Sequence, residues 1–185
     1  MKLVIGLGNP TERFKKTRHN LGFICLDYWA KKHSLSFSKS DIYSYLVVKE
    51  LVLIKPNTYM NLSGEAAKHA LKKWCIDETL VVHDDIELDP CQLRIRNGGG
   101  DGGHNGIKSL FDAIQPSDLR RIRVGIGRSE TLSPDVYVLD NFTDEELQAY
   151  DECIRLVSKF IDVFSMYDFS QVLNEYSKWK KSYSG

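Results

Sequence analysis

The sequence predicts a single α/β domain in which a twisted, mixed and largely parallel sheet carries helices on both faces. Short apolar runs that read as buried strands alternate along the chain with segments whose apolar residues recur at helical spacing. The length of 185 residues suits one domain, and no repeat or linker divides it. We therefore treat residues 1–185 as one domain that ends in a basic, aromatic tail from about residue 176.

The first half of the chain supplies predicted strands and two predicted helices. Residues 2–8 read as a buried strand that runs into an Asn-Pro turn. A helix is expected from Asn20, where apolar residues fall at helical spacing. Residues 43–56 contain one or two strands and end at a proline. Ser63 is expected to cap a second helix, whose apolar face carries Ala66, Ala67, Ala70, Leu71 and Trp74.

The second half continues the alternation. Residues 79–83 read as a buried strand, and residues 91–96 alternate like a half-exposed one. Residues 104–114 are expected to form a short helix, and residues 121–127 a further strand. Because ligands of such sheets bind at the carboxyl ends of the strands, the polar residues that follow these strands are expected to mark the site.

Two helices are predicted near the carboxyl terminus. Thr143 and Glu146 have the spacing of a capping box, which predicts that a helix of about twenty residues follows. Asp168 and Gln171 indicate another helix. The tail beyond it is either a nucleic-acid contact or a frayed terminus.

Composition and charge describe an ordinary soluble protein and exclude several classes. Basic and acidic residues number 25 each, and 42% of the residues are hydrophobic. No run approaches the ~18 apolar residues of a membrane span, and no cleavage site of a signal peptide is visible. The four cysteines are scattered without a C-x-x-C pair. We therefore expect a cytoplasmic protein with reduced thiols, no cysteine-bound metal and no membrane contact.

The familiar nucleotide and metal motifs are absent from the sequence. GLGNPT begins like a dinucleotide-binding turn, but Thr11 stands where the third glycine of that fingerprint belongs. There is no phosphate loop of the G-K-[ST] type, no H-E-x-x-H and no G-x-S-x-G. The acidic run at residues 83–89 lacks the central glycine and final glutamate of a calcium loop. A nucleotide-dependent oxidoreductase is therefore the weakest candidate.

Charge and glycine are unevenly distributed. Basic residues gather at residues 13–18, 94–96 and 120–123, which favours an anionic ligand. Residues 98–106 hold six of the thirteen glycines. Such density indicates either a flexible linker or a segment that needs positive φ angles or a close approach to a ligand.

The remaining polar residues suit the hydrolysis of an ester or amide. A histidine is the natural general base near neutral pH, and an aspartate on its far nitrogen fixes the tautomer. Because no serine or cysteine has the setting of a nucleophile, the base is expected to act on water. His83 is equally compatible with a core position at a strand end. The polar residues in non-repetitive positions are Asn9, His19, Asn20, Asn57, Asn61, His83, Asp84, Asp85, His104 and Asn105.

Five segments stand out when they are taken together in their order and spacing: GLGNP (6–10), FKKTRHNLGFICLD (14–27), PNTYMNLSG (56–64), VVHDDIELD (81–89) and GGGDGGHNGIKS (98–109). They closely resemble the motifs of the bacterial peptidyl-tRNA hydrolase family, from residue 2 to about residue 165. That family cleaves the ester between a peptide and the 3′ ribose of its tRNA. The resemblance implies a monomeric mixed α/β fold, no cofactor, no metal and no obligate protein partner, with the acceptor stem and 3′ end of peptidyl-tRNA as the ligand.

The resemblance also implies roles for individual residues. His19 matches the base that activates water, and Asp84 matches the carboxylate that supports it. Asn9 matches the asparagine that distinguishes N-blocked peptidyl-tRNA from free aminoacyl-tRNA. A carboxamide or a backbone N–H is expected to stabilise the oxyanion. The matching substrate and tRNA positions are Asn61 and Asn105 as carboxamides, Phe14 and Tyr59 as aromatic residues at the tRNA 3′ end, and Arg96 and Arg123 as phosphate contacts.

The chain departs from the family pattern at a few positions. Thr11 replaces the usual glycine, Phe14 a common tyrosine, and Arg96-Asn97 the more usual Lys-Leu. None of these changes the base or its carboxylate. Plant relatives that serve as RNA-splicing factors provide the main alternative, a protein that binds RNA without hydrolysis. Against it stands the retention of Asn9, His19, Asn61, Asp84 and Asn105, because RNA binding alone needs no water-activating base. With the family site in mind, the glycine segment is expected to come close to the substrate and to place Asn105.

Overall fold

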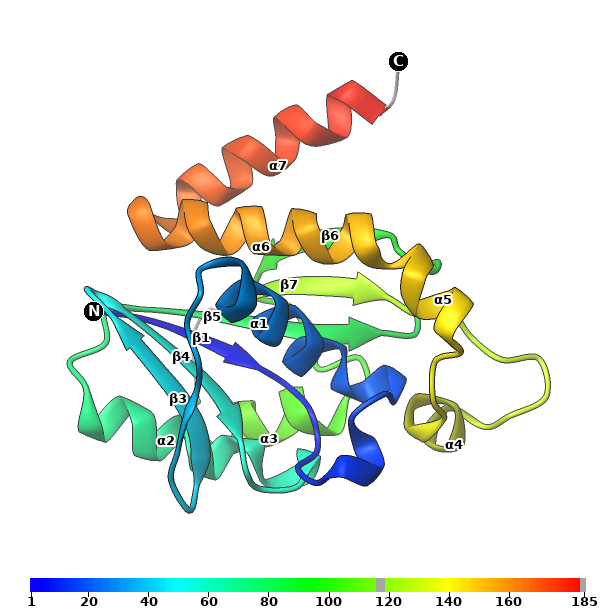
Figure 1. Ribbon diagram of the computed structural model, residues 1–185, viewed down its shortest axis with the longest axis horizontal. Coiled ribbons are helices and arrows are strands. Elements are labelled where there is room, and N and C mark those ends of the chain that lie inside the picture. The colour runs from blue at the N-terminus through cyan, green and yellow to red at the C-terminus, as the bar shows by residue number, and fades with distance from the viewer. Residues whose placement is uncertain (116–118, 184–185) are drawn as a thin grey trace.

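The protein folds into three layers, with a seven-stranded sheet between two groups of helices (Figure 1). The computed structural model describes residues 1–115 and 119–183. Within those residues, no helix combines the length and the apolar character that crossing a membrane requires. The strands are β1 (Lys2–Gly6), β2 (Ser38–Lys39), β3 (Tyr43–Val48), β4 (Leu51–Pro56), β5 (Glu78–Asp85), β6 (Leu93–Asn97) and β7 (Arg120–Gly125).

The sheet is mixed, with a parallel centre. Its order is β2-β3-β4-β1-β5-β7-β6. Strands β4, β1, β5 and β7 run parallel to one another, whereas β2 and β3 on one side and β6 on the other pair antiparallel. The predicted fold class is confirmed. Because successive side chains of a strand point to opposite faces, β1 sends Leu3 and Ile5 into one core and Val4 into the other.

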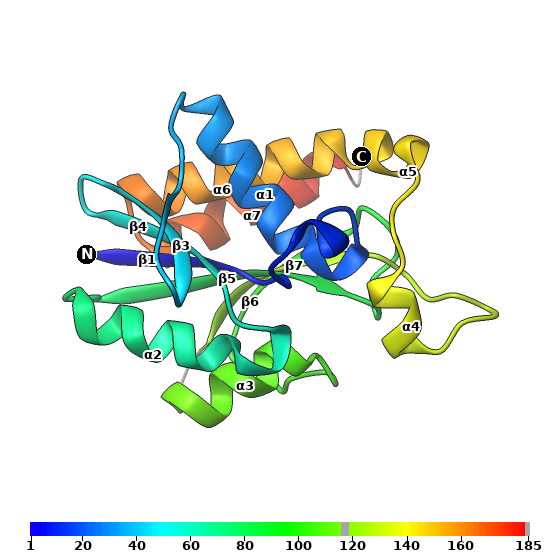
Figure 2. The same ribbon diagram turned by 60° about the horizontal axis from the view of Figure 1, so that its bottom comes forward.

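Helices cover both faces, as Figure 2 shows. Helices α1, α6 and α7 lie on one face and α2 and α3 on the other, each group over its own cluster of buried apolar side chains. The longer helices are α1 (Leu21–Lys32), α2 (Ser63–Lys73), α3 (Asn105–Ile114), α6 (Asp151–Met166) and α7 (Phe169–Tyr183). The short ones are η1 (Glu12–Phe14), η2 (Arg18–Asn20), η3 (Met60–Leu62), α4 (Pro134–Leu139) and α5 (Asp144–Ala149).

Two predictions about helix ends need correction. Ser63 does not cap α2 but is its first residue, and its hydroxyl donates to the carbonyl of Met60 at 2.9 Å. The 3-10 turn η3 runs directly into α2, which turns this hydroxyl back toward the preceding turn. The capping box of Thr143 and Glu146 is confirmed. However, the helix that it begins is interrupted at Tyr150, which separates α5 from α6. The Tyr150 side chain is buried, and its hydroxyl donates to the carbonyl of Gly125.

The predicted tail forms the last turns of α7, and residues 184–185 lie outside the described part of the chain. Tyr176 anchors this helix, because its hydroxyl donates to the carbonyl of Leu93 on β6 at 2.9 Å. Trp179 stacks on Tyr176 with ring centroids 5.9 Å apart. The tail is therefore helical as far as Tyr183, with Tyr176 and Trp179 half-buried and residues 180–183 exposed.

A close approach between α1 and the sheet places the segment that carries His19. A Cβ atom at Gly22 would lie 2.4 Å from the carbonyl oxygen of Val82 and 2.5 Å from the nitrogen of Leu7. Only glycine permits this contact at the carboxyl ends of β1 and β5. Because η2 immediately precedes α1, the contact brings His19 next to the end of β5, where Asp84 lies.

Candidate active site

His19 and Asp84 form a buried pair. Nδ1 of His19 lies 3.0 Å from each carboxylate oxygen of Asp84. His19 is 6% exposed and Asp84 is 1% exposed, so water competes little for this contact. The carboxylate can only accept, which places the His19 proton on Nδ1. In the neutral ring, Nε2 of His19 is then the acceptor, the atom that can take a proton.

A second histidine, His104, contacts the same carboxylate. Its Nε2 lies 3.0 Å from Oδ1 of Asp84, and its Nδ1 accepts from the backbone N–H groups of Gly106 and Ile107 at 3.1 and 3.3 Å. His104 thereby caps α3. Since Nδ1 is an acceptor, the proton must be on Nε2, and His104 donates to Asp84.

These contacts control the ionisation of the buried groups. Burial by itself raises the pKa of Asp84, but the electrostatic attraction and the hydrogen bonds of the His19 and His104 N–H groups outweigh it, and the pKa is lowered far below its usual value. Asp84 is therefore ionised. Burial also lowers the pKa of His83 well below its usual value. His83 donates from Nδ1 to the carbonyl of Asp84 at 2.7 Å, which confirms its core position at a strand end.

Among the described residues, His19, Asp84 and His104 have the types and spacing of a metal site, with ligand atoms all within 4.8 Å of one another. The surroundings of His104 disfavour such a use. A metal-bound imidazole donates its other N–H to an acceptor, whereas Nδ1 of His104 faces two backbone N–H donors. The arrangement suits hydrogen bonds to an ionised aspartate better than coordination of a cation.

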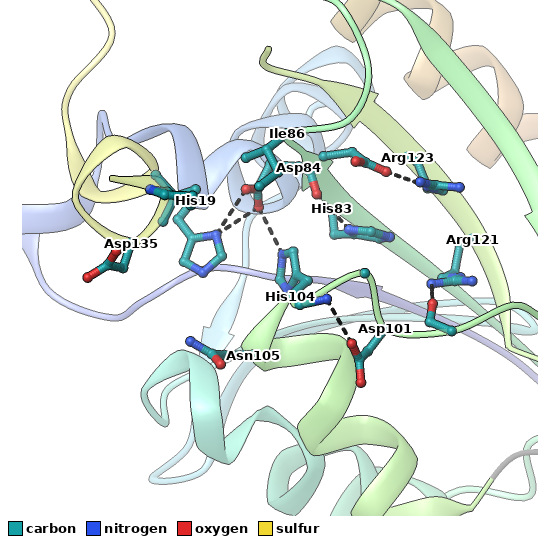
Figure 3. Close-up of a pocket in the computed structure, with 16 residues that line it drawn as sticks. His19, His83, Asp84, Ile86, Asp101, His104, Asn105, Arg121, Arg123 and Asp135 are labelled. Atoms are coloured by element: carbon teal, nitrogen blue, oxygen red, sulfur yellow. Dashed lines mark hydrogen bonds and ion pairs between the residues drawn. The ribbon is translucent and has the colours of Figure 1, made fainter. Parts of the chain in front are cut away.

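A cavity of about 230 Å³ opens beside this cluster. Figure 3 shows His19 and His104 on one side of it and His83, Arg121 and Arg123 toward the other. Asp85 pairs with Arg123 at its wall. Ile86 follows β5 in the lining, and the glycine segment and α4 contribute the remaining residues, Gly100, Asp101, Gly102, Gly103, Asn105, Pro134, Asp135 and Val138.

Comparisons with known proteins identify the family. A sequence profile of the peptidyl-tRNA hydrolase family matches residues 3–184. The chain belongs to the peptidyl-tRNA hydrolase family. A peptidyl-tRNA hydrolase from Shouchella clausii is 42% identical over 185 residues, covering 96% of this chain and all of that one. One from Fervidobacterium nodosum is also 42% identical, covering 95% of each chain. The crystal structure of peptidyl-tRNA hydrolase from Acinetobacter baumannii superposes with a TM-score of 0.82 at 29% identity, covering 94% of this chain and 93% of that one.

Asn9, which the family motif singles out, is fixed from three directions. Its backbone N–H donates to Oδ1 of Asn20 at 2.8 Å, and its carbonyl accepts from Nδ2 of Asn20 at 3.0 Å. Its side-chain Oδ1 accepts from the N–H of Met60 at 2.8 Å. Nδ2 of Asn9 has no partner among the described residues, so the orientation of the amide is set while its donor stays available.

The other residues of the family motifs that were expected near the substrate fall into two groups. Asn105 is exposed at the start of α3 and lines the cavity. Phe14, Tyr59 and Asn61 lie outside its lining. Phe14 and Tyr59 meet edge to face with ring centroids 6.3 Å apart. Because Tyr59 directly precedes Met60, which binds Asn9, this aromatic pair lies on the Asn9 side of the site.

The predicted phosphate contacts lie on neighbouring strands. Arg96 is exposed on β6, and Arg123 is half-buried on β7. The antiparallel register pairs Arg94 with Arg123 and Arg96 with Arg121, so four arginines share one face of the sheet. Like charges directly opposite each other are unfavourable without a counterion. Asp85 supplies one counterion by pairing with Arg123, and an anion bound on this face would supply another.

The basic cluster at residues 13–18 proves less available to a ligand than its charge implies. Arg18 is buried and pairs with Asp140 at 3.0 Å and Glu146 at 2.8 Å. Lys16 pairs with Asp144 at 2.9 Å. These contacts fasten the segment before His19 to α5 and to the end of α4.

Three residues that organise the site had no individual role in the sequence analysis, which included Asn20 and His104 only among the polar residues and Arg121 only in a basic cluster. His104 and Asn20 each adjoin a residue that the motifs do single out. However, histidine is not among the usual helix caps. The sequence therefore did not indicate that His104 both caps α3 and donates to Asp84.

Proposed function

We propose that this protein hydrolyses the ester bond of peptidyl-tRNA with water activated by His19. The observation that carries the proposal is the buried contact of His19 Nδ1 with Asp84. It fixes the tautomer in which Nε2 takes a proton from water, and the carboxylate stabilises the imidazolium that forms. An ester is reactive enough for this base-assisted attack without a side-chain nucleophile.

Asn9 recognises the acylated amine of the substrate. Its Nδ2 donates to the carbonyl of the first peptide group, while its Oδ1 stays on Met60. A free ammonium group would present a donor where the site requires an acceptor. Such a mismatch costs roughly 1–3 kcal/mol, which favours N-blocked over free aminoacyl-tRNA.

The arginine face of β6 and β7 binds the acceptor stem through phosphates. Arg96 and Arg123 make these contacts, next to the cavity that holds the ester end. Phosphate contacts position a substrate without reading its sequence, which suits an enzyme that must accept many tRNAs. The contribution of these residues weakens as salt increases.

The test is the release of tRNA from N-acetyl-aminoacyl-tRNA and from free aminoacyl-tRNA, with a metal chelator present. We expect rapid cleavage of the blocked substrate and little of the free one. Asn9→Asp is a matched variant, because it retains Oδ1 for Met60 and lacks the Nδ2 donor. It is expected to lose about 10- to 100-fold in kcat/KM on the blocked substrate. A folded wild-type protein that binds tRNA and cleaves neither substrate would instead be an RNA-binding relative.

A further inference from the structure

Arg121 lies in the arginine face but is used internally. It is 3% exposed, and its two terminal nitrogens donate to the carbonyl oxygens of Gly98 and Gly100, the latter at 2.8 Å. Neither terminal nitrogen contacts a carboxylate in the described residues, and its Nε is buried without a hydrogen-bond partner. The hydrogen bonds of the Arg121 guanidinium therefore go to backbone carbonyls of the glycine segment.

The backbone of Gly98 and Gly99 adopts a conformation that favours glycine, next to the guanidinium of Arg121. Gly98 and Gly99 have φ angles of 71° and 91°, a region that side chains disfavour. A Cβ atom at Gly99 would lie 2.9 Å from a terminal nitrogen of Arg121. Gly100, by contrast, has no heavy atom within 4 Å of such a Cβ and no positive φ. The contact with Arg121 thus requires glycine at position 99, the positive φ angle favours it at position 98, and neither condition applies to Gly100.

Hydrogen bonds continue from the glycine segment to the catalytic pair. The side chain of Asp101 accepts from the N–H of Gly103 at 2.7 Å, and its carbonyl accepts from the N–H of His104 at 3.1 Å. His104 then donates to Asp84. The loop that Arg121 holds at one end therefore delivers His104 and Asn105 at the other.

We propose that Arg121 is a positioning residue for the reaction, which holds the glycine segment so that His104 and Asn105 meet Asp84 and the substrate. The inference rests on the proposed hydrolase function. It separates Arg121 from its neighbours Arg96 and Arg123. Those two act on phosphate and therefore on substrate binding, whereas Arg121 acts through the loop and therefore on the chemical step.

The experiment compares Arg121→Met, Arg121→Lys and the matched control Arg96→Gln with N-acetyl-aminoacyl-tRNA over a series of salt concentrations. Arg121→Met is expected to lower kcat by about 10- to 100-fold, because misplacement of about 1 Å has effects of that size. The salt dependence of its KM should match that of the wild type. Arg96→Gln is expected to raise KM, keep kcat and reduce the salt slope by about 1. Arg121→Lys should recover part of the lost kcat, since one ammonium reaches one carbonyl.

A glycine variant tests the same link without changing charge. Gly99→Ala is expected to lower kcat as Arg121→Met does, because its new Cβ atom would meet the guanidinium of Arg121. Circular dichroism and thermal unfolding identify any variant that fails to fold. If Arg121→Met does not fold, the kcat values of Arg121→Lys and Gly99→Ala test the proposal. The proposal is overturned if folded Arg121→Met keeps its kcat, or if it raises KM and loses salt dependence as Arg96→Gln does. A wild type without hydrolysis would refute the proposed function instead.

Discussion

His104 donates to Asp84 with one ring nitrogen and caps α3 with the other. The Nε2 contact to the carboxylate measures 3.0 Å, and Nδ1 accepts from the N–H groups of Gly106 and Ile107. The cap forces the tautomer that donates to Asp84. In this way the start of a helix fixes a proton next to the candidate base.

Two substitutions separate the roles of His104. In His104→Asn the new side chain can cap α3 but is too short to reach Asp84, and in His104→Ala both contacts are lost. We expect both variants to lose about tenfold or more in kcat, because a hydrogen bond to a charged group contributes roughly 1.5–3 kcal/mol. Only His104→Ala should lose a further ~1 kcal/mol of unfolding free energy. Urea unfolding and tRNA release measure the two effects, and full kcat in His104→Asn would show that the contact with Asp84 is dispensable.

Buried His83 should make the protein less stable in mild acid. Its pKa is lowered in the folded protein, mainly by burial, so only the unfolded chain takes up this proton as the pH falls below about 6.5. The unfolded state then binds more protons, and the free energy of unfolding falls toward acid pH by at most about 1.4 kcal/mol per pH unit.

The measurement for His83 is urea unfolding at about pH 7.5 and about pH 5. His83→Asn can keep a donor for the carbonyl of Asp84 but does not titrate. The variant should show a pH dependence smaller than that of the wild type by up to about 2 kcal/mol over this range. An equal pH dependence in both proteins would mean that folding does not lower the pKa of His83.

Thr11 is strained where the family usually has glycine. Its φ and ψ angles of 82° and 150° lie in a region that is essentially reserved for glycine. Relief of this strain, offset by the greater freedom of glycine in the unfolded chain, should raise the unfolding free energy of Thr11→Gly by about 1 kcal/mol. Thermal unfolding checks this, with Glu12→Gly as the control expected to destabilise. A lower melting temperature for Thr11→Gly would show that the threonine side chain contributes more than its backbone costs.

The fold could be predicted because its signals are local. Buried strands such as residues 79–83 and the capping box at Thr143 depend on a few neighbouring residues, and the structure confirms both. The features that were missed depend on distant contacts. At Tyr150, where the helix is interrupted, the buried hydroxyl reaches the carbonyl of Gly125, which is 25 residues away in the sequence. Helix α4 contains a V-Y-V-L run whose composition favours a strand.

The part of the candidate site that could be predicted consists of motif residues that lie at or near the ends of predicted strands. His19 and Asp84 are brought together, and Asn9 is held with its amide donor available. The support behind them was not predictable, because Arg121 is 23 residues from Gly98 in sequence and contacts its carbonyl only in the folded protein. The dense glycine run indicated that the backbone was constrained there, but it did not indicate that Arg121 was the residue that constrains it.

The most direct test of the account is the single-turnover rate of N-acetyl-aminoacyl-tRNA hydrolysis by the wild type, His19→Asn and Asp84→Asn, with enzyme in excess. Loss of a general base should reduce the rate of His19→Asn by about 10²- to 10⁴-fold, and Asp84→Asn should be reduced similarly because the amide no longer fixes the tautomer. Binding of tRNA should be retained by both. A folded His19→Asn protein that hydrolyses the substrate at the wild-type rate would contradict the role assigned to His19.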